Sequence, residues 1–486
     1  MATTVGTCPY NGQQAANTSS TPTLKTVNEI PGPKRVSFLQ RRHDVKNYFN
    51  YLLELNETYG DIVKEEFAFS SKPVVHVFSP EYAEKVFRTD GNQPHIVPLQ
   101  ETTKNYRTMR GMNPGLGNLN GDEWYRLRSA TSQILMKPQG MEKYVPFVEQ
   151  VAHHLIDHIR YNQNSDNEVD MRKIAGRWSL ESAGLIVFER RLGALNDNVE
   201  WADYLTGLNH EIFKLSADLK FALPIFRFLP TGKWRKLVEL EDKFYAEAHV
   251  LMKRAISDIR NNKIKISQQM LVGELASQRT LTEEDVKIIM LSLFSDGLST
   301  TAPMLIYNLY NLAKHPDIQD EIRKEVNSVS KNGEELVSAK RNKLPMLKAS
   351  IKETFRLYPI GTEISRIPQK SVTLGEYVID PFTPIDINTN ILTRSAKLFT
   401  NPNEYQPSRW LRGGEKGDSA HPYALLPFGI GPRMCAGRRF AEQDLQIVLS
   451  RLIQNYKISY NYDGISQIYE TLLLPNGNCH FKFEQI

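Results

Sequence analysis

The most constraining feature of the sequence is the stretch FGIGPRMCAGRRFAE, which runs from Phe428 to Glu442 and contains Cys435. Directly after the cysteine, apolar residues recur with the spacing of one helix face: Ala441, Leu445, Val448, Leu449 and Leu452. Cys435 therefore precedes a predicted helix N-terminus, where unpaired N–H groups and the helix dipole favour a thiolate over a thiol. Such a thiolate is a good soft ligand for iron.

The residues around the cysteine predict an open turn. Gly429, Gly431 and Pro432 favour a tight turn before it, and Gly437 lets a flat ligand approach the backbone closely. A lone cysteine in such a loop is more often a buried structural residue than a ligand. The surrounding pattern must therefore decide between the two interpretations.

That pattern is F-x-x-G-x-R-x-C-x-G, and Phe428, Gly431, Arg433, Cys435 and Gly437 meet it in full. It resembles the haem-binding loop of the cytochrome P450 family. The resemblance implies haem b as the cofactor, bound by Phe428, Arg433 and Cys435. It also implies that Cys435 is the axial ligand of the haem iron.

Bulk composition excludes several other classes. The chain has 486 residues with 41% hydrophobic and 24% charged residues, which is ordinary for a globular protein. Its net charge of +5 is too mild to suggest a nucleic-acid partner. Its three cysteines, Cys8, Cys435 and Cys479, argue against a disulfide framework and fit a reducing compartment. No uninterrupted apolar run is long enough for a transmembrane helix.

The order of patterns along the chain predicts a mainly α fold with a small β region. Ile30-Pro31-Gly32-Pro33 marks the entry to the folded part. Alternating residues predict strands at 62–67 and 74–78, helical patterns follow to about 355, and short strands return in 361–395 and 455–486. We predict a single cytochrome P450-type catalytic domain over 30–486, with a long central helix above the haem and the cysteine loop beneath it. Residues 1–29 are either a flexible tail or a transit segment.

A second motif, Trp124-x-x-x-Arg128, places both side chains on one helix face. Alone it is a weak signal, because many surface helices carry such a pair. The resemblance implies that the Trp124 indole and the Arg128 guanidinium reach a haem propionate. Arg366, which follows Pro359 at the family's distance, matches a further propionate-binding arginine.

The third motif lies inside the long helical pattern from about Thr282 to His315. In the family this helix carries an acid followed by a threonine that manages protons at bound O2. Thr300 matches the threonine, but Ser299 stands where the family has the acid, and Asp296 occupies a position that is usually small. Asp296 precedes Thr300 by four residues, so both project from one face.

Pro303 adds a second local feature, because it has no N–H for the carbonyl of Ser299. We hypothesise that Thr300, Ser299 and a water held at this carbonyl relay protons. Asp296 either feeds that relay or binds a substrate hydroxyl. The alternative is that Ser299 only solvates the helix and Asp296 faces solvent.

The fourth motif pairs Glu353 with Arg356 three residues later on a predicted helix. The later segment Tyr405-x-Pro407-x-Arg409-Trp410 matches the family loop that adds a second arginine. The resemblance implies a structural triad of Glu353, Arg356 and Arg409 that holds the loop presenting the thiolate.

Four basic residues point to the mitochondrial branch of the family. Lys348 and Lys352 form a ridge on the Glu353 helix, and Arg438 and Arg439 follow the cysteine. They match residues that contact an acidic ferredoxin in that branch, although solvated surface charges are the ordinary alternative. We expect an adrenodoxin-like ferredoxin with its reductase as electron donor, and location on the matrix side of the inner membrane.

Several positions match segments that line the family's substrate pocket: Gly297, Ile360, Glu363 and Leu472. Glu363 is an unusual charge there and suggests recognition of a polar substrate group. The segment FALPIFRFLPTGKW, residues 221–234, suits a lid that contacts a membrane surface, or else a packed loop.

These features together imply a haem-thiolate monooxygenase that inserts one atom of O2 into a lipophilic substrate. A steroid or sterol, including an ecdysteroid-type molecule, is the favoured class, and a xenobiotic is the alternative. A peroxide isomerase or lyase of the same fold and a haem-binding carrier remain rival functions. The retained Thr300 disfavours the first rival.

Overall fold

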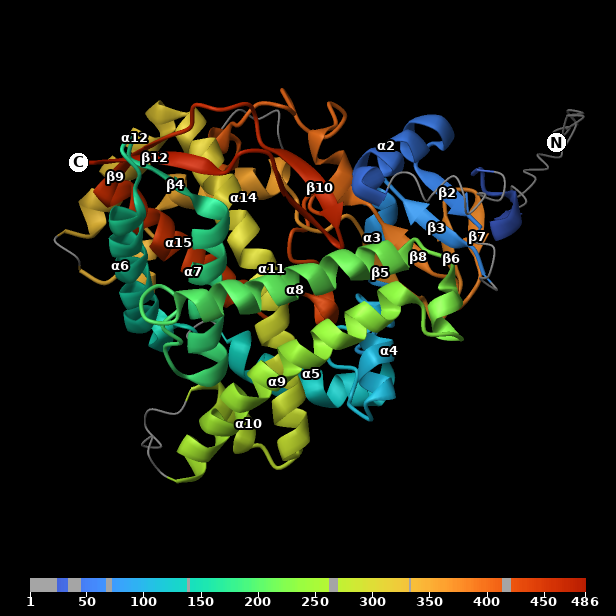
Figure 1. Cartoon of the computed structure of the whole chain (residues 1–486). Coiled ribbons are helices and arrows are strands. Elements are labelled where there is room, and N and C mark those ends of the chain that lie inside the picture. The colour runs from blue at the N-terminus through green and yellow to red at the C-terminus, as the bar shows by residue number, and fades with distance from the viewer. Residues whose placement is uncertain are drawn as a thin grey trace, which may run out of the picture.

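The structure is a computed structural model that describes residues 24–33, 45–66, 72–137, 140–261, 270–331, 334–412 and 421–486. Cys8 and residues 1–23 of the predicted tail lie outside the described residues. Helices form the larger part of the molecule, and the sheets lie at its periphery (Figure 1). The predicted mainly α fold with a small β region is confirmed.

The described α-helices are α2 (Tyr48–Tyr59), α3 (Pro80–Arg88), α4 (Glu101–Met109), α5 (Gly121–Leu135), α6 (Val145–Asn162), α7 (Met171–Phe188), α8 (Val199–Lys220), α9 (Gly232–Arg260), α10 (Leu271–Ala276), α11 (Glu283–Lys314), α12 (Pro316–Val329), α13 (Ser338–Arg341), α14 (Pro345–Leu357) and α15 (Arg438–Asn455). The described strands are β1 (Lys25–Thr26), β2 (Ile62–Glu65), β3 (Val74–Val77), β4 (Glu168–Asp170), β5 (Ile364–Arg366), β6 (Val372–Leu374), β7 (Tyr377–Ile379), β8 (Ile385–Ile387), β9 (Tyr456–Ser459), β10 (Ser466–Glu470), β11 (Leu472–Asn476) and β12 (His480–Gln485).

The strands pair across long stretches of sequence. A four-stranded sheet has the order β2-β3-β8-β5, with β3 and β8 parallel. Two three-stranded sheets have the orders β1-β7-β6 and β4-β12-β9, and β10 with β11 forms a hairpin. β1 pairs with β7, so residues 25–26 of the segment expected to be a tail are attached to a sheet. The strands predicted near 62–78, in 361–395 and in 455–486 are all present.

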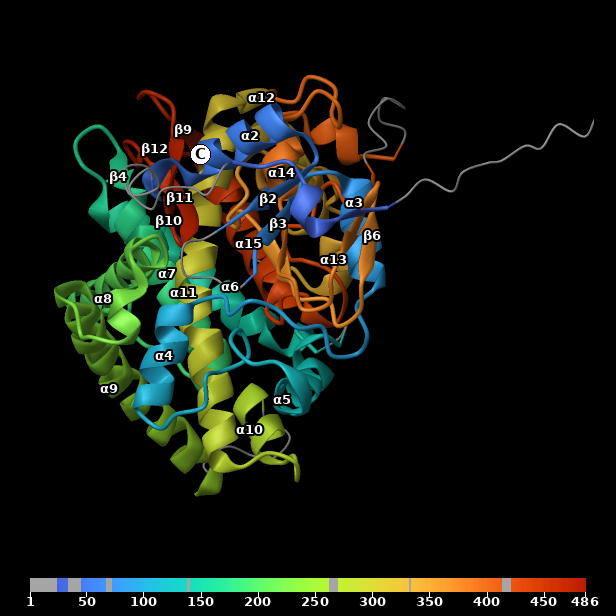
Figure 2. The ribbon, with the colours of Figure 1, turned by 90° about the vertical axis from the view of Figure 1, so that its right-hand side faces the viewer.

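α11 is the long central helix. Thr282 caps its N-terminus in a capping box with Asp285, which satisfies N–H groups that the first turn leaves free. Apolar side chains surround most of the helix, so it packs through the middle of the molecule, with α7 as its main neighbour. Figures 1 and 2 together place α8 and α9 over one side of it.

α11 also tests the expectation about membrane spans. Among the described residues it is the one helix long and apolar enough to cross a membrane by length and composition. Most of its apolar stretch is buried inside the molecule, as expected for a core helix.

Candidate active site

The loop that carries Cys435 folds back on itself before α15 begins. Gly429 and Gly431 have φ values of +68° and +73°, a region that other residues rarely adopt. The N–H of Cys435 donates to the carbonyl of Phe428 at 2.8 Å. A Cβ on Gly437 would meet only the sulfur of Cys435, at 4.0 Å. The predicted turn and the helix after it are therefore confirmed.

The pKa of Cys435 corrects the expectation that the helix start would by itself favour a thiolate. Burial raises the pKa of the thiol, and the charge of Asp296 raises it further. The N–H groups of Gly437 and Arg438 and the charge of Arg128 lower it, but by less. The helix contribution is thus present but outweighed by burial. A coordinated metal ion deprotonates such a thiol outright.

Cys435 and Asp296 lie within electrostatic reach of each other. Both side chains have exposed surface, yet burial raises the pKa of each. Exposed surface and a pKa raised by burial are compatible if the exposed atoms border a space inside the molecule. Protein around that space keeps out most of the water. Because Asp296 acts electrostatically on Cys435, α11 and the cysteine loop lie within reach of one another across this space.

Arg433 lies at the centre of the predicted cofactor-binding residues. Its guanidinium lies over the ring of Trp124, 3.7 Å from the centroid. It donates to the carbonyls of Pro94 and Leu119 at 2.7 and 2.8 Å and to Oδ1 of Asn120 at 2.7 Å. The structure therefore brings Arg433 and Trp124 together and adds Asn120. Asn120 was not predicted from the sequence. It precedes α5, at a position where Asn often caps a helix, and this was the one sequence signal that could have identified it.

Arg128 and Arg366 surround Arg433 with like charges. Burial lowers the pKa of Arg433 to about 9, the charges of Arg366 and Arg128 contribute in the same direction, and Asp90 opposes them. Asp90 is an ion-pair partner of Arg366, with Oδ2 2.6 Å from Nε. Arg128 donates to the carbonyl of Met434, while its buried Nε has no partner within the described residues. Among the described residues, the Asp90 carboxylate thus acts on two of these three enclosed guanidinium groups, those of Arg366 and Arg433.

This excess of positive charge fits haem b. The two propionates of a haem would bring two negative charges to a cluster that has one, and would offer an acceptor to the unpaired Nε of Arg128. Trp124, Arg128, Arg366 and Arg433 would hold the propionate side. Cys435 would bind the haem iron, with Gly437 leaving room beside the sulfur.

α11 presents Thr300 and Asp296 one turn apart. Oγ1 of Thr300 donates to the carbonyl of Asp296 at 2.9 Å. Burial raises the pKa of the Asp296 carboxyl to about 6, and the charge of Arg107 partly offsets this. Pro303 lies inside the helix, so the Ser299 carbonyl lacks its usual N–H donor.

Two predicted residues of α11 point toward neighbouring helices. The hydroxyl of Ser299 accepts a hydrogen bond from Nδ2 of Asn209 on α8 at 2.6 Å. A Cβ on Gly297 would lie 3.4 Å from that of Ala183 on α7. Gly297 therefore allows α7 and α11 to approach closely, and it does not face the predicted substrate pocket. The Ser299 side chain is committed to α8, so a proton relay is left with Thr300 and the Ser299 carbonyl.

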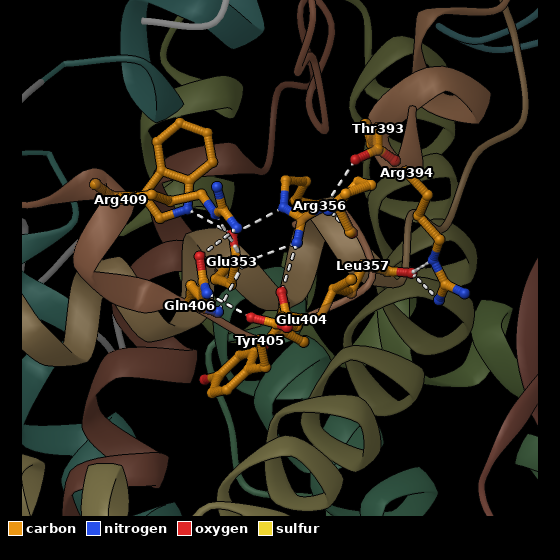
Figure 3. A network of polar contacts seen from close by, with 12 residues as sticks. Glu353, Arg356, Leu357, Thr393, Arg394, Glu404, Tyr405, Gln406 and Arg409 are labelled. Carbon is orange, nitrogen blue, oxygen red and sulfur yellow. Dashed lines mark hydrogen bonds and ion pairs between the residues drawn. The ribbon is translucent and has the colours of Figure 1, made fainter. Parts of the chain in front are cut away.

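Glu353, Arg356 and Arg409 form the expected triad (Figure 3). Oε1 of Glu353 lies 2.7 Å from Nη2 of Arg356 and 3.0 Å from Nε of Arg409. Nε1 of Trp410 donates to Oε2 at 2.9 Å, a contact that the motif did not reveal. Glu353 and Arg356 have no exposed surface, so the charges neutralise each other inside the protein.

The triad ties distant loops to α14. Arg356 also donates to the carbonyls of residues 393, 402 and 404 (Figure 3). On the same helix, the ring of Phe355 contacts that of Phe428 in the cysteine loop, with centroids 5.0 Å apart. α14 therefore contacts the cysteine loop directly through Phe355, while its buried charges hold the segment from residue 393 to 410.

Three of the four predicted basic residues lie together. Burial, followed by the charge of Arg438, lowers the pKa of the exposed Lys352, so these two side chains are close. Lys348 acts electrostatically with Glu442, which forms an ion pair with Arg438 at 3.0 Å. Arg439 instead donates to the carbonyl of Met136 at the end of α5. We call the cluster of Lys348, Lys352 and Arg438 the basic ridge.

The segments of the predicted pocket meet at the β10–β11 hairpin. The carbonyl of Ile360 accepts from the N–H of Leu473 at 2.8 Å, which places Leu472 next to the Ile360 segment. Glu363 forms an ion pair with Lys220 at the end of α8, 2.7 Å apart. This corrects the expectation that Glu363 awaits a polar group of the substrate, because the protein already supplies its counter-charge.

Comparison with known proteins points to one family over nearly the whole chain. The family model Cytochrome P450 matches residues 29–483. A Probable cytochrome P450 CYP44 of Caenorhabditis elegans is 49% identical over 100% of this chain and 99% of its own length. Probable cytochrome P450 12d1 distal, mitochondrial, of Drosophila melanogaster is 29% identical over 97% and 94%, respectively. Sterol 26-hydroxylase, mitochondrial, of Rattus norvegicus is 28% identical over 96% and 90%.

The matches and the site agree. The cysteine loop, the arginine cluster and the buried triad occur on one fold in the order that the motifs predicted. The chain therefore belongs to the cytochrome P450 family, as a monooxygenase that binds haem b and uses O2 on a lipophilic substrate.

Proposed function

We propose that this cytochrome P450 is a mitochondrial enzyme that hydroxylates a steroid or sterol with electrons from a ferredoxin. Its relatives include a mitochondrial sterol 26-hydroxylase, and a second relative is also described as mitochondrial. The observation that carries the proposal is the basic ridge beside the cysteine loop. Peripheral attachment to the matrix side of the inner membrane is part of the proposal.

The basic ridge suits a small acidic electron carrier. Lys352 is exposed, and the side chain of Arg438 is 42% exposed even though it contacts Glu442. Exposed charges of one sign steer an oppositely charged partner and lose that effect as salt screens them. The ridge lies next to the loop of Cys435, so a partner bound there has a short route to the haem.

When bound, haem b supplies the iron at which O2 is activated. The residues of the chain then have separate tasks. Arg128, Arg366 and Arg433 would neutralise the propionates. The triad holds the segment from residue 393 to 410 against α14, the helix whose Phe355 contacts the cysteine loop. Thr300, beside the Ser299 carbonyl that lacks its usual N–H donor, holds and passes a proton on the face of α11 that it shares with Asp296.

The segment between α8 and α9 supports membrane attachment. Ile225, Phe228 and Leu229 are 46%, 84% and 65% exposed, which forms an apolar tip on the outside of the molecule. Such a tip can enter the acyl boundary of a bilayer without spanning it. Figure 1 shows this segment at the end of the long α8 and α9 helices.

Reconstitution tests the electron donor. The purified holoenzyme should consume NADPH and form product with bovine adrenodoxin and its reductase, and the rate should fall as salt rises. Lys352→Glu should weaken adrenodoxin binding about tenfold, while Lys253→Glu, an exposed position on α9, serves as the matched control. Support by microsomal cytochrome P450 reductase alone would reject the ferredoxin.

A binding screen tests the substrate class. Sterols and steroids should shift the haem absorption of the holoenzyme at low concentration, and drug-like amines should not. The opposite ranking would favour a xenobiotic-oxidising enzyme.

A further inference from the structure

A buried arginine of α4 lies across from α11 in the internal space. Arg107 is 4% exposed. Its Nη1 donates to the carbonyl of Pro114 at 2.9 Å and to Oγ of Ser292 at 3.3 Å, and its Nε donates to the hydroxyl of Tyr245. Within the described part of the chain, Nη2 meets no protein acceptor, yet it is not sealed from the surrounding space. One donor group of a fixed guanidinium is therefore free.

Asp296 supplies the complementary group. Ser292 precedes Asp296 by four residues, so the guanidinium bound to Ser292 lies about one turn along the same face of α11. Among the described residues, no donor meets the Asp296 carboxyl, and no ion pair within 4.0 Å joins it to Arg107. The charge of Arg107 nevertheless acts on it. The two groups thus lie near each other with a gap between them.

The surroundings keep Arg107 in this position. The hydroxyl of Tyr245 accepts a hydrogen bond from Nε of Arg107. The charge of Arg107 also lowers the pKa of the Glu241 carboxyl, which itself accepts from Oγ1 of Thr103 at 2.9 Å. A side chain with this many partners cannot swing out to meet Asp296 without breaking several buried hydrogen bonds. The separation between the two groups is therefore fixed by the hydrogen bonds that hold Arg107.

We propose that Arg107 and Asp296 form a binding site for a hydroxyl group of the lipophilic substrate. The hydroxyl donates to the Asp296 carboxylate and accepts from Nη2 of Arg107. A hydroxyl satisfies both groups at once, because it is both a donor and an acceptor. A carboxylate would be repelled by Asp296 and an ammonium group by Arg107, so each charged ligand satisfies one group at the expense of the other. This inference rests on the proposed function, and it specifies the chemistry of the substrate.

The test measures dissociation constants by calorimetry, which does not depend on turnover. The ligands are 5α-androstane and its 3β-hydroxy and 17β-hydroxy derivatives, added to the holoenzyme. Asp296→Ala should weaken binding of the preferred hydroxysteroid about tenfold to one-hundredfold and leave androstane unchanged. Arg107→Lys should weaken it in the same selective way. Arg110→Gln, an exposed position paired with Asp242 at the end of α4, is the control.

The outcomes separate the possible failures. Equal losses for androstane and its alcohols, or no loss for either, would overturn the hydroxyl site. If no steroid binds the wild-type protein, the proposed steroid class fails, and 1-dodecanol against dodecane then decides the hydroxyl site alone. Tighter binding of dodecanoate or dodecylamine than of dodecanol would also refute it. A melting curve for each variant identifies misfolding. If Asp296→Ala or Arg107→Lys misfolds, the binding data of the other variant decide the test.

Discussion

Asp444 on α15 has no exposed surface, and neither carboxyl oxygen has a hydrogen-bond partner within the described residues. Burial raises its pKa from 3.8 to about 7, and the nearby Ser182 hydroxyl, which forms no hydrogen bond to it within the described residues, offsets this only in part. Below pH 3.8 both the folded and the unfolded chain hold the proton. Between pH 3.8 and about 7 only the folded chain holds it, so stability falls as the pH rises. Above about pH 7 the loss is complete.

The size of the effect follows from this interval. A difference of about 3 pH units corresponds to about 4 kcal/mol in the free energy of unfolding. A change from pH 5 to pH 8 covers about 2 pH units of the range in which only the folded chain holds the proton. The free energy of unfolding should therefore fall by roughly 3 kcal/mol because of Asp444. In a chain of 486 residues this corresponds to a fall in Tm of roughly 3 °C.

The variant Asp444→Asn removes the titrating group while keeping its shape. From pH 5 to pH 8, we expect the Tm of the wild-type holoenzyme to fall by roughly 3 °C more than that of the variant. The comparison concerns slopes, because the Asn amide also lacks partners and lowers stability at every pH. Asp197→Asn, at an exposed position, should leave the wild-type slope unchanged. Parallel curves for wild type and Asp444→Asn would refute the reasoning.

Three further changes test other parts of the molecule. Glu353→Gln leaves two buried arginines without their carboxylate, which should destabilise the protein by about 3–5 kcal/mol and lower the ratio of Soret to protein absorbance; a normal ratio would show that the triad is dispensable. Thr300→Ala should lower the product formed per O2 consumed and raise peroxide release, with recovery in Thr300→Ser. Lys220→Gln breaks the link to Glu363 and should raise ligand release about twofold to fivefold in stopped-flow measurements, and unchanged release would mean that this ion pair does not restrain the end of α8.

The sequence was sufficient for features that depend on local spacing. The cysteine loop, the i,i+3 pair of Glu353 and Arg356 and the one-turn spacing of Asp296 and Thr300 all lie where the pattern predicted. Each of these depends on helix geometry or on glycine at a turn, which neighbouring residues determine. The long central helix and the short strands followed from the same periodicities.

Tertiary structure alone decided what lies opposite each of these residues. Asp90 meets Arg366 across 276 positions of the chain, Lys220 meets Glu363 across 143, and Ser299 turns to Asn209. It also decided the balance of charge, since burial outweighs the helix start at Cys435. The physical reason is that spacing sets the face on which a side chain lies. Its pKa and its partners depend on how much water and which charges the rest of the fold brings to that face.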